Sequence, residues 1–155
     1  MSEAPKKLLV IAHSPSPNTR KLRDALLAGA QSVTGVRVTC HAPLETQADA
    51  VLDCDGILLS TPENLGYMSG ALKDFFDRIY YPCLEQTQGL PYALQVRAGQ
   101  DGAGTVAAVE RIVTGLRWKP VQAALVCQGK FQPAFLEQCR ELGETFATAL
   151  DMGVI

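Results

Sequence analysis

The chain has 155 residues, a formal net charge of -2 at pH 7 and a sequence pI near 5.6. This length suits one domain, residues 1–155, that buries its core without disulfide or metal support. The charge gives no positive field for nucleic acid, the apolar runs are too short to span a bilayer, and no signal-peptide core follows the N-terminal MSEAPKK. We therefore expect a soluble, cytoplasmic protein without nucleic-acid partners or membrane insertion.

Short apolar runs alternate along the chain with stretches of helical periodicity, which is typical of a parallel sheet covered by helices. In chain order, strands are predicted at Lys7–Ala12, Val36–His41, Gly56–Ser60, Tyr92–Arg97 and Val121–Cys127. Helices are predicted at Asn18–Val33, Gln47–Leu52, Ser69–Tyr81, Gly104–Leu116 and Pro133–Met152. Because crossovers between parallel strands are right-handed and cover both faces, these units predict a three-layer α/β fold with a five-stranded parallel sheet.

The positions of two unusual loops favour the strand order 2-1-3-4-5. In that order a ligand crevice lies between the loops that follow the first and third strands. Those loops contain the stretches HSPSPNT, residues 13–19, and TPENLGYMSG, residues 61–70. The sequence therefore predicts a ligand site where these two loops meet.

The first loop joins a buried strand to a helix start, where backbone N–H groups and the positive end of the helix dipole favour an anion. It lacks the glycines and lysine of a Walker loop and the GxGxxG of a dinucleotide fold, so it suits a phosphate bound by neutral groups. The alternative is a helix N-cap formed by Ser16 or Asn18. The neutral donors of this loop are Ser14, Ser16, Asn18 and Thr19.

Both loops resemble the flavin-binding loops of the flavodoxin-like superfamily. SPSPNT is similar to the T-x-T-G-N-T phosphate loop of flavodoxins, with the four neutral donors on matching positions and Pro17 in place of the glycine. TPENLGYMSGALKDFFDR, residues 61–78, resembles the second flavin loop and following helix of the NAD(P)H-dependent FMN reductase and quinone reductase group. In flavodoxins FMN lies at this switch point. The resemblance therefore implies a flavodoxin-like fold with bound FMN.

In that family the second loop runs along the edge of the isoalloxazine ring, and its backbone bonds the polar rim of the ring. The resemblance gives this role to residues 62–68. Gly66 would allow close approach of the backbone, Pro62 would stiffen the entry and Asn64 tolerates unusual backbone angles.

The other side chains of the second loop have two interpretations each. Leu65, Tyr67 and Met68 offer apolar contacts to the ring, but Tyr67 and Met68 also fit simple packing under the following helix. Glu63 is either a cofactor contact or a solvated turn residue. Beyond it, Ser69 is expected to cap a helix whose charged residues, including Lys73 and Arg78, form a solvated face.

A third loop, RAGQDGAG, follows the fourth predicted strand. Its glycines, Gly99 among them, let it pass close to the flavin or a nicotinamide, and Arg97 and Gln100 are placed to contact the pyrimidine side or a substrate. The alternative is a flexible connector. The loop lacks the aromatic residue with which electron-carrier flavodoxins usually cover the ring, so the resemblance implies a more open flavin face.

The family resemblance implies an NAD(P)H-dependent, FMN-containing reductase that passes hydride to a quinone, free flavin or similar small acceptor. Because the flavin carries this chemistry, no catalytic acid, base, nucleophile or metal is expected from the protein. His13 is interpreted as a structural residue. The alternatives are a flavodoxin-like electron carrier and a flavodoxin-fold binding module that has lost FMN.

Two further expectations concern assembly and thiols. The family resemblance and the aromatic helix segment Phe75–Tyr81 both indicate a homodimer with a shared surface near the flavin. The five cysteines are odd in number, widely spaced and without a CxxC pair, so we expect neither a disulfide framework nor a zinc site. A catalytic pair of a cysteine with His13 or His41 is conceivable, but no spacing in the sequence supports one.

Overall fold

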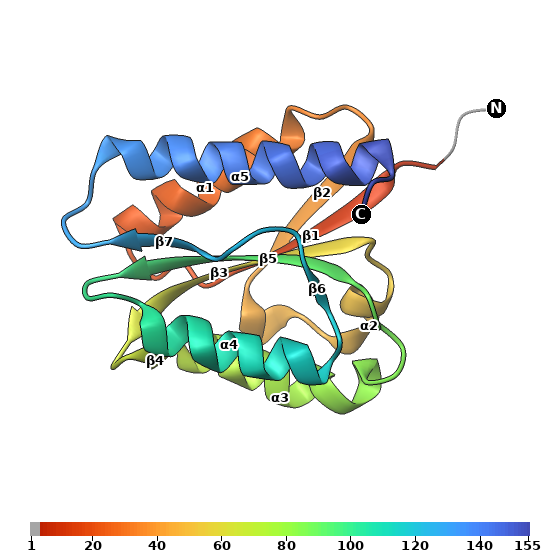
Figure 1. Cartoon of the computed structure of the whole chain (residues 1–155), viewed down its shortest axis with the longest axis horizontal. Helices are drawn as coiled ribbons and strands as arrows, with labels where there is room; N and C mark the ends of the chain where they lie inside the picture. The colour runs from red at the N-terminus through yellow and green to blue at the C-terminus, as the bar shows by residue number, and fades with distance from the viewer. Residues whose placement is uncertain (1–3) are drawn as a thin grey trace.

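The computed structural model describes residues 4–155 and shows a mainly parallel sheet with helices on both faces (Figure 1). The strands are β1 (Lys6–Ala12), β2 (Val36–His41), β3 (Gly56–Asn64), β4 (Tyr67–Met68), β5 (Pro91–Ala98), β6 (Lys119–Pro120) and β7 (Leu125–Gln128). The helices are α1 (Pro17–Gln31), the 3-10 turn η1 (Pro43–Glu45), α2 (Ala48–Leu52), α3 (Gly70–Cys83), α4 (Ala103–Gly115) and α5 (Pro133–Met152).

The parallel strands run in the order β2-β1-β3-β5, followed by β6 and β7, which pair with successive parts of β5. This confirms the predicted order 2-1-3-4-5 and the three-layer architecture. The predicted count of five strands was wrong, because residues 4–155 form a sheet of seven strands. The extra strands arise because β3 continues into a hairpin with β4, and because the predicted strand Val121–Cys127 bends away from β5 between β6 and β7.

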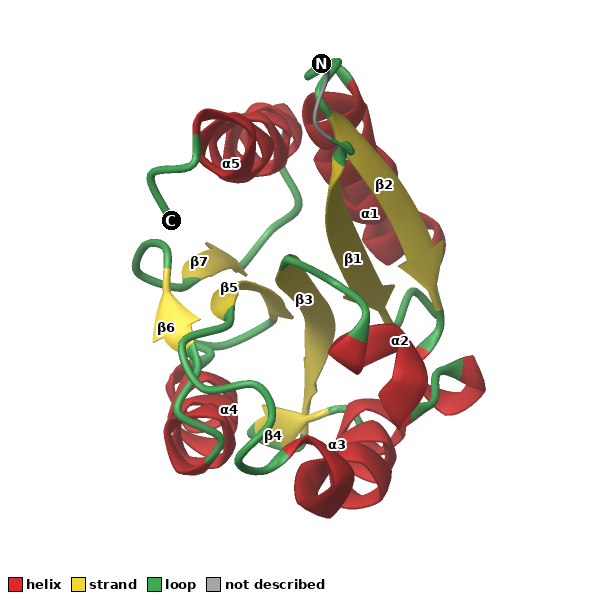
Figure 2. Ribbon diagram, turned by 90° about the vertical axis from the view of Figure 1, so that its right-hand side faces the viewer, coloured by secondary structure: helices red, strands yellow, loops and turns green. Residues whose placement is uncertain are grey.

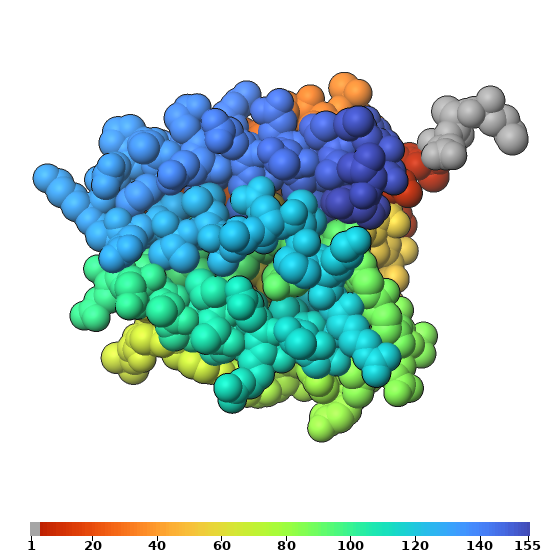
Figure 3. All heavy atoms as spheres, viewed as in Figure 1, coloured from red at the N-terminus to blue at the C-terminus, as the bar shows by residue number. Residues whose placement is uncertain are grey.

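Two hydrophobic layers hold the helices against the sheet. Helices α1 and α5 cover one face, and α3 and α4, with the short α2, cover the other (Figure 2). The space-filling view shows the segment around β6 and β7 lying between α5 and α4 (Figure 3). Strands β1 and β3 are apolar and buried along most of their length, as expected for strands covered on both faces. No helix among residues 4–155 is long and apolar enough to cross a bilayer.

Glycine sets how closely the helices of the first layer approach. A Cβ atom at Gly29 of α1 would overlap the carbonyl oxygen of Arg140, and one at Gly143 of α5 would overlap that of Leu26. The two helices therefore pack backbone against backbone along the C-terminal half of α1.

Candidate functional site

Three loops gather at the edge of the sheet where β1, β3 and β5 end, at the left of Figure 1. The backbone N–H of His13 donates to the carbonyl oxygen of Ser60 at 3.0 Å, so the chain stays paired with β3 one residue beyond β1. The first loop thus starts from a fixed position beside the strand that leads into the second loop. This is the edge at which doubly wound sheets bind their ligands.

The first loop forms a capping box at the start of α1. The Ser16 hydroxyl accepts from the Thr19 backbone N–H at 3.2 Å, and the Thr19 hydroxyl accepts from the Ser16 N–H at 2.9 Å. Thr19 is 7% exposed, and its hydroxyl also donates to the Ser16 carbonyl oxygen at 3.0 Å. These two residues therefore already hold the helix start, which is the N-cap alternative that the sequence left open for Ser16.

The remaining donors of this loop are free to face a ligand. The Ser14 hydroxyl and His13 Nδ1 are buried and have no hydrogen-bond partner among residues 4–155. Burial lowers the pKa of His13, so its imidazole is neutral at neutral pH. Pro15 and Pro17 contribute no N–H groups. An unpaired buried hydroxyl beside a helix N-terminus is chemically suited to a phosphate oxygen, because it would supply the missing partner.

The second loop is a β-hairpin rather than an irregular loop. Residues 62–64, predicted as loop, belong to β3, and Glu63 and Asn64 pair with Met68 and Tyr67 of β4. The two turn residues both have positive φ angles, 54° for Leu65 and 73° for Gly66, as a two-residue type I′ turn requires. The hairpin therefore projects a narrow backbone edge past the end of the sheet.

The side chains of the hairpin point in different directions. Leu65 is fully exposed, Tyr67 is 40% exposed and Met68 is 2% exposed within the core. Met68 can thus face a ligand with its backbone only. Ser69 caps α3 as predicted, accepting from the Leu72 N–H at 3.2 Å, and its own N–H donates to the Thr61 hydroxyl at 3.1 Å.

A cavity of about 480 Å³ separates the hairpin from the third loop. Its volume is in the range of small-molecule sites. The Gln100 backbone N–H donates to the Glu63 carboxylate at 3.3 Å across it. A Cβ atom at Gly104 in the first turn of α4 would overlap the Gly66 carbonyl oxygen, so the hairpin rests directly on that helix. The cavity is lined by Glu63, Leu65, Gly66, Gly99, Gln100, Asp101 and Gly104.

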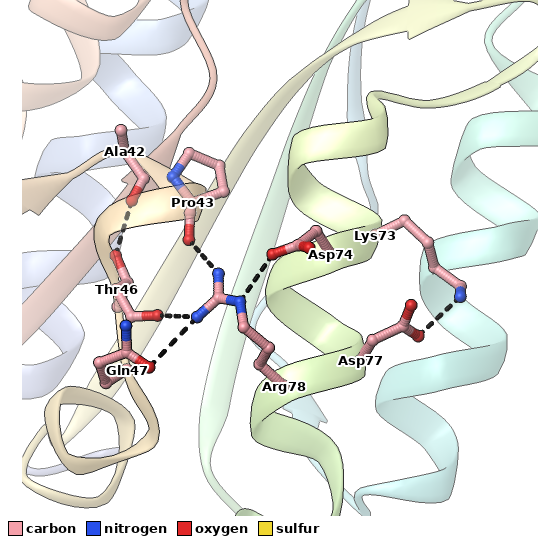
Figure 4. A network of polar contacts seen from close by, with 8 residues as sticks. All are labelled: Ala42, Pro43, Thr46, Gln47, Lys73, Asp74, Asp77 and Arg78. Atoms are coloured by element: carbon pink, nitrogen blue, oxygen red, sulfur yellow. Dashed lines mark hydrogen bonds and ion pairs between the residues drawn. The ribbon is translucent and has the colours of Figure 1, made fainter.

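Arg78 of α3 braces the η1 segment that follows β2, which the sequence did not indicate (Figure 4). Its guanidinium donates to the carbonyl oxygens of Thr46 at 2.6 Å and Pro43 at 2.7 Å, and to the Asp74 carboxylate at 2.6 Å. The expected solvated role was therefore wrong for Arg78, although Lys73 does pair with Asp77 on the surface. Sequence spacing reveals the Arg78–Asp74 pair, but the contacts with η1 depend on the tertiary fold.

Replacing Arg78 with alanine should lower the free energy of unfolding by about 1–3 kcal/mol, because two carbonyl groups lose a charged donor. The segment after β2 should also become more accessible to hydrogen exchange. Urea denaturation monitored by circular dichroism measures the first effect. The matched variant Lys73→Ala removes only an exposed ion pair and should leave the midpoint nearly unchanged. Equal midpoints for the two variants would contradict the bracing role of Arg78.

The cysteines differ in their environments. Cys127 of β7 is fully buried, and a hydrogen bond with Cys139 lowers the pKa of its thiol. All five are free thiols. Burial raises the pKa of Cys54 to about 12 and that of Cys83 to about 11, so both stay protonated at neutral pH. Cys54 and Cys83 are therefore not activated nucleophiles.

Comparisons with known proteins agree with this geometry. The pattern of the NADPH-dependent FMN reductase family matches residues 37–132, more than half of the chain. A flavodoxin of Aquifex aeolicus is 30% identical over 110 residues, covering 71% of this chain and 60% of that protein. An NAD(P)H dehydrogenase (quinone) of Acidithiobacillus ferrooxidans is 28% identical over 92 residues, 46% of each chain. This chain thus spans less than two thirds of either relative.

Superposition on solved structures identifies the fold separately from these sequence comparisons. A flavodoxin from the domain Archaea superposes with a TM-score of 0.80 at 19% identity, covering 93% of this chain and 98% of that chain. A flavodoxin, WrbA-like protein from Agrobacterium tumefaciens superposes with a TM-score of 0.75 at 17% identity, covering 96% and 98%. The resemblance inferred from the two loops is confirmed: the chain has a flavodoxin-like fold and belongs to the NADPH-dependent FMN reductase family.

Proposed function

We propose that the chain binds FMN at the carboxyl edge of its sheet, takes hydride from NADH or NADPH, and passes it to a quinone, free flavin or similar small acceptor. One observation carries this proposal. Residues predicted from the second and third loops, including Glu63, Gly66 and Gln100, line one cavity of about 480 Å³, although no residue of the first loop lines it. Membership of the FMN reductase family supplies the chemical class.

Different loops would bind different parts of the cofactor. The α1 N-terminus with Ser14 and Asn18 would bind the phosphate, while Ser16 and Thr19 keep the helix start in place. The hairpin backbone from Pro62 to Met68 and the third loop at Gly99 and Gln100 would border the ring. When bound, FMN supplies the hydride chemistry, so the protein's contribution is to bind and orient its reactants.

Two serine variants separate phosphate binding from helix capping. Ser14→Ala should weaken FMN binding by about 1–3 kcal/mol with unchanged thermal stability, because its hydroxyl holds nothing in the protein. Ser16→Ala should lower the free energy of unfolding by about 0.5–2 kcal/mol through loss of the cap. Fluorescence titration of FMN and thermal melts measure both. Unchanged FMN affinity in Ser14→Ala would remove this serine from the phosphate site.

A flavodoxin-like electron carrier is the second candidate, favoured by the Aquifex flavodoxin that is 30% identical. Steady-state assays with the FMN-loaded protein separate the two. A reductase should oxidise NADH or NADPH when only a quinone or free FMN is added. A carrier should show no such turnover and should accept electrons only from a reductase protein. Turnover confined to the latter assay would overturn the hydride-transfer proposal.

We also propose a homodimer that works in the cytoplasm. Exposed apolar side chains occur on η1, the hairpin and α3, with Leu44 at 61%, Tyr67 at 40% and Tyr81 at 79% exposure. Such groups are suited to a subunit interface. Five free thiols fit a reducing compartment. Light scattering that reports a monomer at micromolar concentration would remove the dimer while leaving the hydride-transfer proposal intact.

A further inference from the structure

Arg97 is held rigidly at the carboxyl edge, on the face of the sheet that α5 covers. Its Nη1 donates to the carbonyl oxygens of Ala98 at 2.8 Å and Cys127 at 2.9 Å. The guanidinium carbon lies 5.8 Å from the centre of the Phe131 ring and 5.6 Å from that of Phe135. The side chain is half-buried by these contacts. The position of the Arg97 guanidinium is therefore set by contacts with the fold.

A second cation shares the same aromatic ring. The ammonium of Lys21, in the second turn of α1, lies 5.9 Å from the centre of the Phe131 ring. Lys21 and Arg97 come from α1 and β5, and Phe131 from the segment between β7 and α5. We call this group the Arg97–Phe131–Lys21 clamp. It places two positive charges near the Phe131 ring, although the two charges repel each other.

The clamp lacks a negative partner. Among residues 4–155, no carboxylate lies within ion-pair distance of either Lys21 or Arg97. The Nε and Nη2 atoms of Arg97 donate no hydrogen bond to these residues either. A half-buried cation without a counterion is costly, and the free guanidinium edge matches the geometry of a carboxylate, sulfonate or phosphate. The clamp thus presents two cations and a free guanidinium edge to which an external anion can bind.

The clamp is next to the cavity of the hairpin but separate from it. Arg97 pairs in register with Pro62, where the hairpin begins. Its side chain packs towards α5, however, whereas the cavity reaches Gly104 of α4 and contains neither Arg97 nor Phe131. An anion on the clamp would thus not occupy the cavity.

We propose that the Arg97–Phe131–Lys21 clamp recognises the anionic group of the electron acceptor, an aromatic molecule that carries a sulfonate, carboxylate or phosphate. That the bound molecule is an electron acceptor rests on the proposed reductase function. The anion site itself does not depend on that function. Phe131 supplies an apolar contact for the aromatic body, and the two cations bind the charge. A small ligand fits better than a large acidic protein surface, because the chain has a net charge of -2 and the clamp holds only two positive charges.

Calorimetry on the FMN-loaded protein tests the site without turnover. Naphthalene-2-sulfonate should bind about tenfold more tightly than neutral 2-naphthol, as expected for charge-assisted hydrogen bonds. Arg97→Gln should abolish this preference, and Lys21→Gln should reduce it. Arg111→Gln, which changes an exposed arginine of α4, is the matched control and should preserve it. If circular dichroism shows that Arg97→Gln does not fold, Lys21→Gln is the deciding variant. An unchanged preference for the sulfonate in Lys21→Gln then overturns the proposal.

Steady-state kinetics with a matched pair of quinones are the second test. Arg97→Gln should raise the KM for the sulfonated acceptor, 1,2-naphthoquinone-4-sulfonate, about tenfold and leave the KM for its unsubstituted parent quinone unchanged. Equal binding of sulfonate and naphthol to the wild type overturns the clamp. So does loss of FMN in Arg97→Gln, because it would assign this arginine to the cofactor phosphate. Absent turnover with the sulfonate preference intact would instead contradict the reductase proposal and support the anion site.

Discussion

Replacing Gly104 with alanine should produce a folded protein that binds FMN about 10- to 100-fold more weakly than the wild type. The added Cβ would overlap the Gly66 carbonyl oxygen, so either the hairpin or the first turn of α4 has to move. Overpacking of this kind costs about 1–3 kcal/mol, and the displacement falls on the two walls of the cavity. Fluorescence titration of FMN, with circular dichroism beside it, measures the effect.

Gly70→Ala is the matched control. Gly70 also lies in the first turn of a helix after the hairpin, but a Cβ atom there meets nothing within 4 Å, and its φ angle is not in the left-handed region. This variant should keep both its stability and its FMN affinity. If Gly104→Ala binds FMN as tightly as Gly70→Ala does, the contact between the hairpin and α4 does not shape the cofactor site.

Replacing Gly66 with valine should abolish FMN binding while the protein stays folded. Gly66 has a φ angle of 73°, a conformation that a β-branched residue adopts only at a cost of about 1–3 kcal/mol. A Cβ atom at this position meets no protein atom within 4 Å, so the chain itself offers no clash. The effect would come from the altered turn, and from a side chain in the space that we assign to the flavin. The FMN content of the purified variant measures it.

Gly66→Asn separates those two causes. Asparagine tolerates the left-handed region, so this variant should preserve the hairpin. Partial FMN loss in Gly66→Asn beside complete loss in Gly66→Val would assign most of the effect to the turn. Full FMN occupancy in Gly66→Val would show that the hairpin does not border the ring, whereas global unfolding would give Gly66 a purely architectural role.

The sequence predicted the larger elements because their signals are local. Alternating apolar runs and helical periodicity placed every long strand and helix, and α5 was predicted at its observed bounds, Pro133–Met152. The hairpin was missed because its turn holds Leu65, an apolar residue that masks the usual Asn-Gly or Gly-Gly signature. The break between β6 and β7 was missed because Val121–Cys127 is apolar throughout except at Gln122, and only pairing with β5 reveals where it bends.

The strand order predicted from the sequence points to the carboxyl edge as the candidate site, but the sequence could not assign a role to each polar side chain of the first loop. Serine, threonine and asparagine at a helix start serve an N-cap and a phosphate equally well, so sequence cannot separate the two. The structure uses Ser16 and Thr19 for the cap and leaves the Ser14 hydroxyl without a partner. The roles of Arg78 and Arg97 depend on partners more than 25 residues away, which no local pattern encodes.

FMN titration of the cofactor-free chain, followed by anaerobic addition of NADPH, tests whether the chain is an FMN-dependent reductase. We expect saturation at one FMN per chain with a perturbed visible spectrum, and bleaching of that spectrum by NADPH. Free FMN in the same buffer is the control for direct reduction. An unperturbed flavin spectrum at saturating protein concentration would contradict FMN binding and favour a flavodoxin-fold binding module without a flavin.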